Sequence, residues 1–397
     1  MIKKHSEIVV CGAGLVGMTF ALLLSQKKIN VSLIDKNSKK DIFNSSDKRT
    51  TAISQGSSRI YEELGVWKEL KESAQPIYKI YVSEGVQDNK MEFDHENLSE
   101  GPLGFIIDNK ILKQILFNKI LDSKFISFYE KTEILSINNN NNNIEDFITT
   151  DNFRISYKLL VAADGRFSKT RFQAGIKYFH HNYNQNAFVF NITHSKPHHG
   201  VALERFFSTG PLALLPMKDQ YQKKSSVVWT VDSNVSNKKI FGTKIREEFN
   251  KKYQNFFGKI IKFSKFTKYP LNVYSCYTSS KKNVILIGDA CQAIHPIAGQ
   301  GFNLGLRDVV CLSKIISQFK QLGLEVNSIN LLNKYERKRF LDKNLLVSVT
   351  HNLNNLFANN SLPIKLLRRF GLKVFSASSF LKKQSMFYAM GLKNFEL

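Results

Sequence analysis

The first 35 residues alternate apolar and polar segments in the order strand, helix, strand. Residues 8–11 form a short apolar run that predicts a strand, residues 18–24 predict a helix, and residues 31–35 predict a second strand that ends in an acid. A glycine-rich turn, residues 12–17, joins the first strand to the helix. Such a turn lets a pyrophosphate approach the helix start, and the acid reaches a ribose hydroxyl. The pattern predicts a dinucleotide-binding unit; the alternative is a glycine-rich turn in an unrelated α/β domain.

The same region also has features of a secretory signal. Residues 1–4 are basic, and residues 8–24 are nearly free of charge. Cleavage after this stretch would remove the glycine turn, and the strand–helix–strand pattern continues without a break to Asp35. We therefore expect the stretch to be part of the fold.

A second strand–turn–helix arrangement lies far along the chain, at residues 284–303. The apolar run 284–287 predicts a buried strand, and a long helical pattern follows the glycine-rich stretch 299–301. Asp289 and Pro296 lie between them. An acid can accept from hydroxyls, bare glycine backbone allows close approach, and a helix start offers unpaired N–H groups to an electron-rich oxygen. The arrangement predicts a site for a polar, ring-bearing cofactor.

A third motif, residues 162–171, follows the apolar strand 159–161. Its Asp164-Gly165 pair is by itself an ordinary turn signal. The motif gains its meaning from its position between the other two.

The order GxGxxG, ADGxxSxxR and GDAxxxxxPxxGQGxN resembles the single-component, FAD-dependent aromatic hydroxylases of the p-hydroxybenzoate hydroxylase type. Residues 288–309 are similar in particular to the ubiquinone-biosynthesis hydroxylases, closest to the 2-polyprenyl-6-methoxyphenol hydroxylase (UbiH-like) group. Residues 49–54, 65–67 and 210–217 share this likeness. Gln292 stands where many members of the broader family carry His, and we interpret it as a marker of the subgroup.

The resemblance implies an α/β (α+β composite) fold with a Rossmann-like FAD-binding domain, an inserted β-sheet substrate domain and C-terminal helices. The expected FAD-binding domain is discontinuous and comprises residues 1–76, 104–178 and 271–330. The β-rich substrate domain comprises residues 77–103 and 179–270, and residues 331–397 form the helical region.

The resemblance also implies roles for individual residues. Glycines of the first turn would hold the FAD pyrophosphate, Asp35 the adenosine ribose, and Asp289 the ribityl chain or pyrophosphate. The residues that would bind cofactor are Gly12, Gly14, Leu15, Val16, Gly17, Asp35, Lys36, Arg49, Asp164, Arg171, Gly288, Asp289, Pro296, Gly299, Gln300, Gly301, Phe302 and Asn303. By the same analogy Asp164 and Arg171 also serve NAD(P)H handling. His295 and Pro296 are the candidate catalytic residues, although the flavin does most of this chemistry.

The implied reaction is the hydroxylation of a polyprenyl phenol in ubiquinone biosynthesis. NAD(P)H reduces FAD, O2 forms a flavin C4a-hydroperoxide, and its distal oxygen attacks the electron-rich ring. Alternatives on the same scaffold are a prenyl-chain reductase, a halogenase, or a non-catalytic, FAD-stabilised subunit of a quinone-biosynthesis complex. The halogenase WxWxIP motif is absent, because the chain has only Trp67 and Trp229.

Composition narrows the expected partners. Fifty-seven Lys and Arg residues against 33 Asp and Glu residues give a net charge of +24. No basic run combines with the aromatic residues of a nucleic-acid-binding module, so we expect no nucleic acid. An anionic membrane surface is the more credible partner for a lipid-modifying protein. No uncharged apolar run is long enough for a membrane span. The four cysteines show no paired spacing, which fits reduced thiols in a cytoplasmic protein. If the protein contacts the membrane, we expect it to lie on the inner face.

Three further clusters carry weaker signals. Phe206, Leu212, Leu214 and Pro216 form an apolar group that predicts either sheet core or the wall of a substrate pocket. The histidines between residues 180 and 199 lack metal-ligand spacing, so we expect a solvated loop and no metal. The basic, apolar stretch 366–397 fits either docking on a membrane or partner, or a helix that closes the cofactor domain.

Overall fold

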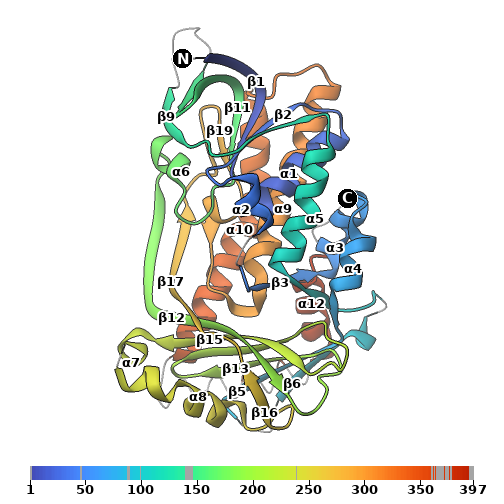
Figure 1. Cartoon of the computed structure of the whole chain (residues 1–397), viewed down its shortest axis with the longest axis vertical. Coiled ribbons are helices and arrows are strands. Elements are labelled where there is room, and N and C mark those ends of the chain that lie inside the picture. Colours follow the sequence, from blue (N-terminus) through green and yellow to red (C-terminus); the bar gives the residue numbers. More distant parts are fainter. Residues whose placement is uncertain are drawn as a thin grey trace.

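The computed structural model describes residues 2–44, 47–86, 90–98, 100–138, 146–237, 239–358 and 378–392, together with residues 361, 363, 371 and 375. Two large sheets lie at opposite ends of the molecule, and the long strands β12 (Tyr178–His194) and β17 (Thr267–Cys276) run between them (Figure 1). We call the eight-stranded sheet the first sheet and the nine-stranded sheet the second sheet.

The first sheet has a parallel centre in the order β19–β11–β1–β2–β8. Residues 8–11 of β1, residues 159–162 of β11 and all of β19 are continuous apolar runs, as expected where both faces of a parallel sheet are covered. Antiparallel strands β18, β10 and β9 extend it. The bounds are β1 (Ile2–Cys11), β2 (Val31–Ile34), β8 (Ile126–Tyr129), β9 (Ile134–Asn138), β10 (Phe147–Thr150), β11 (Phe153–Ala162), β18 (Ser280–Lys281) and β19 (Val284–Leu286).

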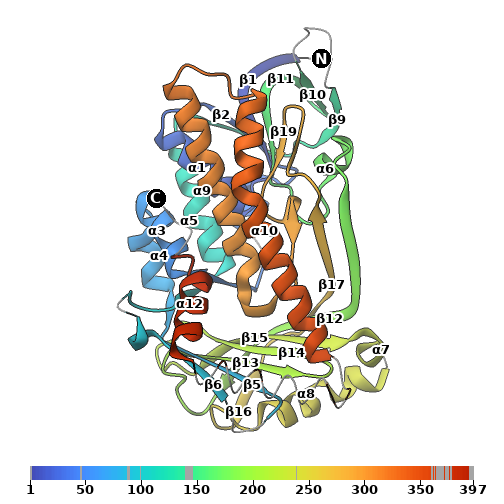
Figure 2. The ribbon, with the colours of Figure 1, turned by 180° about the vertical axis from the view of Figure 1, so that it is seen from behind.

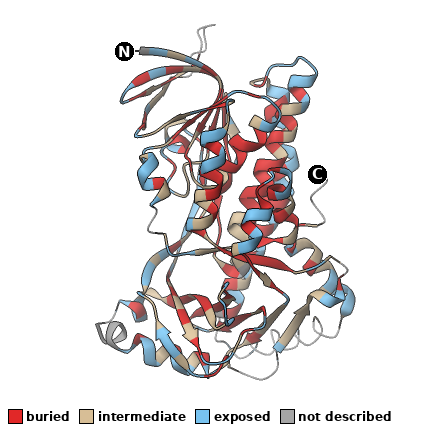
Figure 3. Cartoon of the chain, turned by 45° about the vertical axis from the view of Figure 1, so that its right-hand side comes forward, coloured by how far each residue is buried: buried red, intermediate tan, exposed pale blue. Residues whose placement is uncertain are grey.

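Helices cover one face of this sheet. They are α1 (Leu15–Gln26), α5 (Asn109–Asp122) and α9 (Gln300–Gln321), with the long α10 (Ile329–Ala358) lying beside α9 (Figure 2). Ile8 and Val10 of β1 pack into the helical core, whereas Val9 between them packs into a second core on the opposite face. This period-two alternation places the buried residues between helices and sheet (Figure 3).

The second sheet has the order β20–β17–β12–β15–β14–β13–β5–β6, and β16 also pairs with β12. Helix α8 (Lys239–Tyr253) covers one face, where its Phe249 and Tyr253 pack against Trp229. The other face is turned toward the first sheet. The remaining bounds are β5 (Lys79–Glu84), β6 (Lys90–Asp94), β13 (Val201–Phe207), β14 (Gly210–Pro216), β15 (Lys224–Asp232), β16 (Ile260–Phe263) and β20 (Gln292–Ala293).

A small sheet and short helices complete the described structure. The small sheet contains β3 (Thr50–Ser54), β7 (Gly104–Asp108) and β4 (Gln75–Ile77). The remaining helices are α2 (Lys39–Phe43), α3 (Gln55–Glu63), α4 (Trp67–Ser73), α6 (Lys169–Gln173), α7 (Ser233–Ser236), α12 (Ser379–Ala389), η1 (His95–Asn97), η2 (Gly288–Ala290) and η3 (Ile297–Gly299). No helix among the described residues is both long and apolar enough to cross a bilayer.

The predicted mixed α/β architecture is present, and the division between the sheets differs in detail. The expected break after residue 270 falls inside β17, which continues to Cys276, and β20 of the glycine-rich segment also pairs with β17. Residues 139–143, which belong to a run of asparagines, and 15 of the 32 residues in the basic stretch 366–397 lie outside the described residues.

Candidate functional site

The glycine turn after β1 has two glycines that packing requires and one that faces open space. Gly12 has φ +105°, and a Cβ there would lie 2.6 Å from the Ala163 carbonyl oxygen. A Cβ on Gly17 would lie 1.9 Å from the Gly12 carbonyl oxygen. A Cβ on Gly14 would meet nothing within 4 Å, and Gly14 caps α1 without a side-chain hydrogen bond. The first N–H groups of α1 are therefore available to an anionic ligand.

A cavity of about 670 Å³ opens beside this turn. Asp35, at the end of β2, borders it, and its carboxylate accepts from the backbone N–H groups of Ala13 (2.7 Å) and Asn37 (2.8 Å). Three lysine and three aspartate side chains border the cavity. The lining residues are Gly12, Ala13, Gly14, Asp35, Lys36, Asn37, Lys40, Asp41, Ile42, Asn44, Lys113, Ala163, Asp164 and Gly165.

The second motif joins the first at this cavity. Asp164 Oδ2 accepts from the Thr170 N–H at 3.1 Å. Its Oδ1 is buried and has no hydrogen-bond partner within the part of the chain that the structure describes. A buried carboxylate oxygen without a donor is costly, so a bound ligand with hydroxyl or amide donors fits here.

Arg171 lies in the same motif and connects it to the third motif. Its guanidinium donates to the carbonyls of Ala290 (2.9 Å) and Arg166 (3.0 Å) and lies over the Tyr178 ring. It is 3% exposed. These contacts hold the second motif against the third, and the role of Arg171 in cofactor handling stays a prediction.

The third motif packs directly on the first. Gly288 has φ +58°, and a Cβ there would lie 3.2 Å from the Val16 methyl carbons. A Cβ on Gly305 of α9 would lie 3.1 Å from both Gly288 Cα and a Val16 methyl carbon. Small residues are required here because two helix starts and a strand end meet at one point.

Asp289 follows this contact and lies in a basic environment. Burial raises the pKa of the Asp289 carboxyl, while the positive charges of Arg166 and Arg49 act in the opposite direction. Arg166 Nη2 lies 3.9 Å from Asp289 Oδ2, and the Arg49 guanidinium pairs with Asp47 at 2.7 Å. Asp289 does not itself line the 670 Å³ cavity, but its partner Arg166 directly follows Gly165, which does.

The start of α9 offers a second set of helix N–H groups without a side-chain cap. Gly299 (φ +61°) caps the helix without a side-chain hydrogen bond, and a Cβ there would lie 3.0 Å from Ala52 Cβ. Asn303 accepts from the Ser54 N–H (2.9 Å) and donates to the Ala52 carbonyl (2.9 Å). These bonds fasten α9 to β3, so the N–H groups of Gln300, Gly301 and Phe302 point at a fixed place.

A family model described as "FAD binding domain" matches residues 5–347 of this chain. The chain belongs to this family. The two helix starts then suit the two ends of FAD. The glycine turn and Asp35 would meet the adenosine and pyrophosphate, and the α9 start would meet an electron-rich ring edge. The orphaned Asp164 oxygen and the open space at Gly14 are the observations that fit this group.

Individual relatives of this flavoprotein extend over nearly the whole chain. Ubiquinone hydroxylase UbiL of Rhodospirillum rubrum is 29% identical, covering 98% of this chain and 90% of its own. The 3-demethoxyubiquinol 3-hydroxylase of Escherichia coli is 26% identical, covering 99% and 100%. Among solved structures, p-nitrophenol 4-monooxygenase PnpA of Pseudomonas putida has a TM-score of 0.80 at 14% identity, covering 98% and 99%. This last likeness confirms the predicted fold.

His295 is the predicted catalytic side chain within residues 288–303, which we call the flavin segment. It is 1% exposed, and its Nε2 lies 3.3 Å from Gln185 Oε1. Burial lowers the pKa of His295 to about 3, so the imidazole is neutral at physiological pH. A neutral ring can accept a proton or donate one hydrogen bond, but it cannot serve as a resident imidazolium. Pro296 follows it, half-buried, at the start of η3.

A buried ion network holds the flavin segment to the C-terminal helices. Asp308 accepts from the Gly288 N–H (2.9 Å), from Gln292 Nε2 (2.6 Å) and from Arg339 Nε (2.7 Å). Asp342 bridges Arg339 (2.6 Å) and Arg307 (2.8 Å). The sequence motif contains Arg307 and Asp308, to which we had assigned no role. Two opposite charges side by side in an apolar helix were the one signal of a buried ion network.

The predicted substrate residues divide between two faces of the second sheet. Leu212 and Leu214 point toward α8 and pack with Trp229, on the face turned away from the flavin segment. Pro216 shares their strand parity. Phe206 lies on the opposite face, where it contacts Ile297. Of the four, only Phe206 therefore lies beside the candidate site. Adjacent residues of a strand point to opposite faces of the sheet, so the position along the strand decides which side a residue faces.

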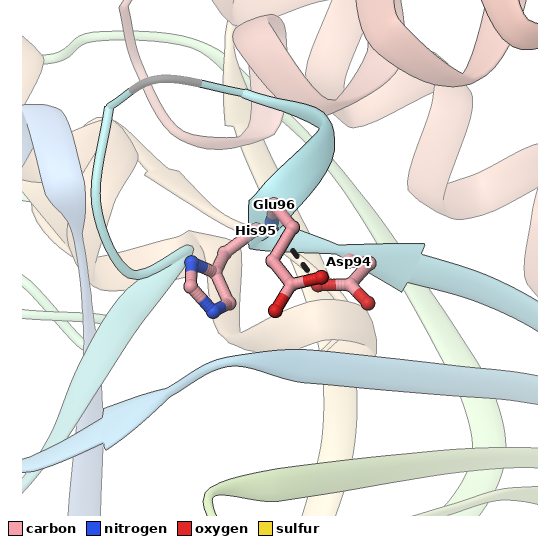
Figure 4. A group of neighbouring side chains, drawn as sticks. All are labelled: Asp94, His95 and Glu96. Carbon is pink, nitrogen blue, oxygen red and sulfur yellow. Dashed lines mark hydrogen bonds between the residues drawn. The ribbon is translucent and has the colours of Figure 1, made fainter.

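The candidate metal ligands are already occupied. His194 and His198 are buried rather than solvated, and they hydrogen-bond Ser225 and the Met217 carbonyl. Figure 4 shows a group formed by Asp94 and the two residues that follow it, His95 and Glu96. Asp94 pairs there with Lys79 at 2.5 Å and accepts from the Glu96 N–H. These neighbours satisfy the carboxylate without an ion.

Proposed function

We propose that this flavoprotein is an NAD(P)H-consuming monooxygenase that hydroxylates the ring of a polyprenyl phenol in ubiquinone biosynthesis. One observation carries the proposal. Asn303 fixes the start of α9 to β3, and Ile297, just before that helix, contacts Phe206 on the second sheet. A flavin ring at that helix start would then lie beside an apolar sheet face. The ubiquinone hydroxylases among its relatives support the choice of a phenol with a prenyl chain.

The bound flavin would supply the redox chemistry, accepting electrons from NAD(P)H and activating O2 for transfer to the ring. The chain would supply three things. Gly14 and Asp35 would hold the cofactor's adenosine half. The N–H groups at the α9 start would stabilise negative charge on its ring edge. The neutral His295 and the helices over the site would exclude water from the reacting centre.

We also propose that the protein approaches its lipid substrate at a membrane surface. Leu341, Leu345, Val349 and Leu356 are exposed along α10 at spacings of four, four and seven residues, so they share one helix face. An exposed apolar face on a chain of net charge +24 fits peripheral contact with an anionic bilayer.

The test of the reaction is oxygen incorporation. The FAD-loaded protein, supplied with NADH or NADPH, 2-farnesylphenol and ¹⁸O2, is expected to form a farnesyl catechol or hydroquinone carrying one ¹⁸O atom. Anaerobic consumption of NAD(P)H with saturation of the prenyl chain would indicate a reductase instead. Absence of any product, together with unchanged cellular quinone in an Asp289→Ala strain, would indicate a non-catalytic subunit.

A further inference from the structure

Glu204 is a buried carboxyl on the inner face of the second sheet. Its neighbours along β13, Leu203 and Arg205, point the other way: Leu203 packs in the core beneath α8, and Arg205 donates to the Lys252 carbonyl at the end of α8. Side chains alternate along a strand. The Glu204 carboxyl therefore points toward the first sheet and the flavin segment.

The contacts on either side of Glu204 locate it more closely. Ala202, two residues before, packs in one cluster with Ala52, the residue that touches Gly299 at the start of α9. Phe206, two residues after, packs against Ile297 of the flavin segment. Its ring also stacks on the Phe357 ring, with 4.0 Å between the ring centroids. Glu204 lies between these two contacts, so its carboxyl is on the sheet face that is turned toward the glycine-rich start of α9.

The surroundings of this carboxyl are apolar. Its cross-strand neighbours are Val82 on β5 and Ala213 on β14. Glu204 is 8% exposed, and among the described residues it has neither a hydrogen bond nor an ion pair. Burial raises its pKa to about 8. A buried polar group with no partner costs stability, and native proteins keep such groups mainly where a ligand satisfies them.

We propose that the Glu204 carboxyl binds the phenolic hydroxyl of the substrate and so orients the ring over the start of α9. The inference rests on the proposed function, because it takes the substrate to be a phenol with an apolar tail. Such a molecule has one polar group to satisfy on its ring. On this face Glu204 offers a carboxyl between the apolar neighbours Val82 and Ala213. A second carboxyl, Glu84, pairs across the strands with Phe206. Binding sites of this kind gain their orientation from a few polar groups set in apolar walls.

The first test compares two probes on the unmodified, FAD-loaded protein. The probes are 2-farnesylphenol and farnesylbenzene, which lacks only the hydroxyl, both in dodecyl maltoside micelles and corrected for partitioning. Binding is followed through the flavin absorbance spectrum. We expect the phenol to bind about tenfold more tightly, because the hydrocarbon leaves the carboxyl unpaired. Equal binding of the two probes would overturn the proposal without any variant.

Variants then assign the preference to Glu204. Glu204→Gln keeps an oxygen acceptor of similar shape and should retain most of the preference for the phenol. Glu204→Leu should reduce it to less than about twofold. The matched control is Glu72→Leu, since Glu72 is exposed on α4, and it should leave the preference unchanged. Retention of the preference in Glu204→Leu would refute the assignment.

Thermal unfolding of the ligand-free proteins gives a readout that a structural role would not share. Glu204→Leu should unfold at a higher temperature than the unmodified protein, since it removes a buried carboxyl that has no partner. A lower unfolding temperature would show that Glu204 stabilises the fold, which contradicts a ligand-binding role.

Failure of the inference can be told from failure of the proposed function. If the unmodified protein incorporates ¹⁸O but Glu204→Leu keeps the phenol preference, the reaction stands and the Glu204 site is wrong. If the preference depends on Glu204 but no protein incorporates ¹⁸O, the phenol site stands and the proposed reaction is wrong.

Discussion

Two glycines of the same turn should respond oppositely to the same small change. Gly14→Ala adds a methyl group to a position with ordinary backbone angles, φ −73° and ψ 176°, and with nothing within 4 Å. Gly17→Ala adds a methyl group 1.9 Å from the Gly12 carbonyl oxygen. The first change fills space that we assign to the FAD pyrophosphate, and the second pushes apart the turn itself.

The structure sets the expected sizes. For Gly14→Ala, the entropy lost from the unfolded chain stabilises by about 0.4–1 kcal/mol, and the poorer helix cap costs a similar amount. The apoprotein's stability should therefore hardly change. For Gly17→Ala, the added methyl group overlaps the backbone of Gly12, which cannot move aside as a side chain could. We therefore expect the free energy of unfolding to fall by about 3 kcal/mol or more. In a chain of this size that lowers the unfolding temperature by roughly 4 °C.

The assay pairs thermal unfolding of the apoproteins with titration by FAD, followed by quenching of flavin fluorescence. Gly14→Ala should unfold like the unmodified protein but bind FAD at least about tenfold more weakly, because the methyl group displaces the pyrophosphate from the helix start. Unaltered FAD affinity in a stable Gly14→Ala protein would refute the assignment of this cavity.

Three further predictions follow from other parts of the molecule. Arg339→Met leaves the buried Asp308 carboxylate without its cation, so the free energy of unfolding measured in urea should fall by about 3–5 kcal/mol. An unchanged free energy of unfolding would show that the network does not stabilise the fold. His295 stays neutral when folded, since burial lowers its pKa to about 3, whereas the unfolded chain takes up a proton below about pH 6.5. Stability should therefore fall as pH drops from 6.5 toward 3, and His295→Gln should reduce that slope by about one proton; an unchanged slope would show a charged His295. Asp164→Asn keeps an acceptor for the Thr170 N–H but replaces the orphaned oxygen by a donor, so FAD affinity should fall by about tenfold while unfolding is unchanged; unaltered affinity would mean that no ligand donor meets that oxygen.

The local patterns of the sequence were sufficient for the cofactor half of the fold. Residues 8–35 form β1, α1 and β2 as predicted, because the glycine turn and the apolar periodicity specify a βαβ unit within a short stretch. The helix after Gly299 is also present. The family likeness supplied the order of the motifs, and the structure shows how Val16, Gly288 and Gly305 pack together.

Two features were beyond sequence reasoning. Strand β14 is apolar at nearly every position, so its pattern does not reveal which residues face the flavin segment. The sequence therefore left sheet core and pocket wall open for Leu212 and Leu214, which pack in the core beneath α8. The partners in the ion network are far apart in sequence, since Asp308 meets Arg339 only after α9 and α10 have packed. Glu204 was missed for the first of these reasons: its meaning depends on strand parity.

The most direct measurement of the whole account is a crystal structure of the protein with FAD and 2-farnesylphenol. We expect the pyrophosphate against Gly14, the isoalloxazine edge at the start of α9, and the phenol ring between that edge and Glu204. A flavin bound elsewhere, or a phenol on the α8 side of the second sheet, would contradict it.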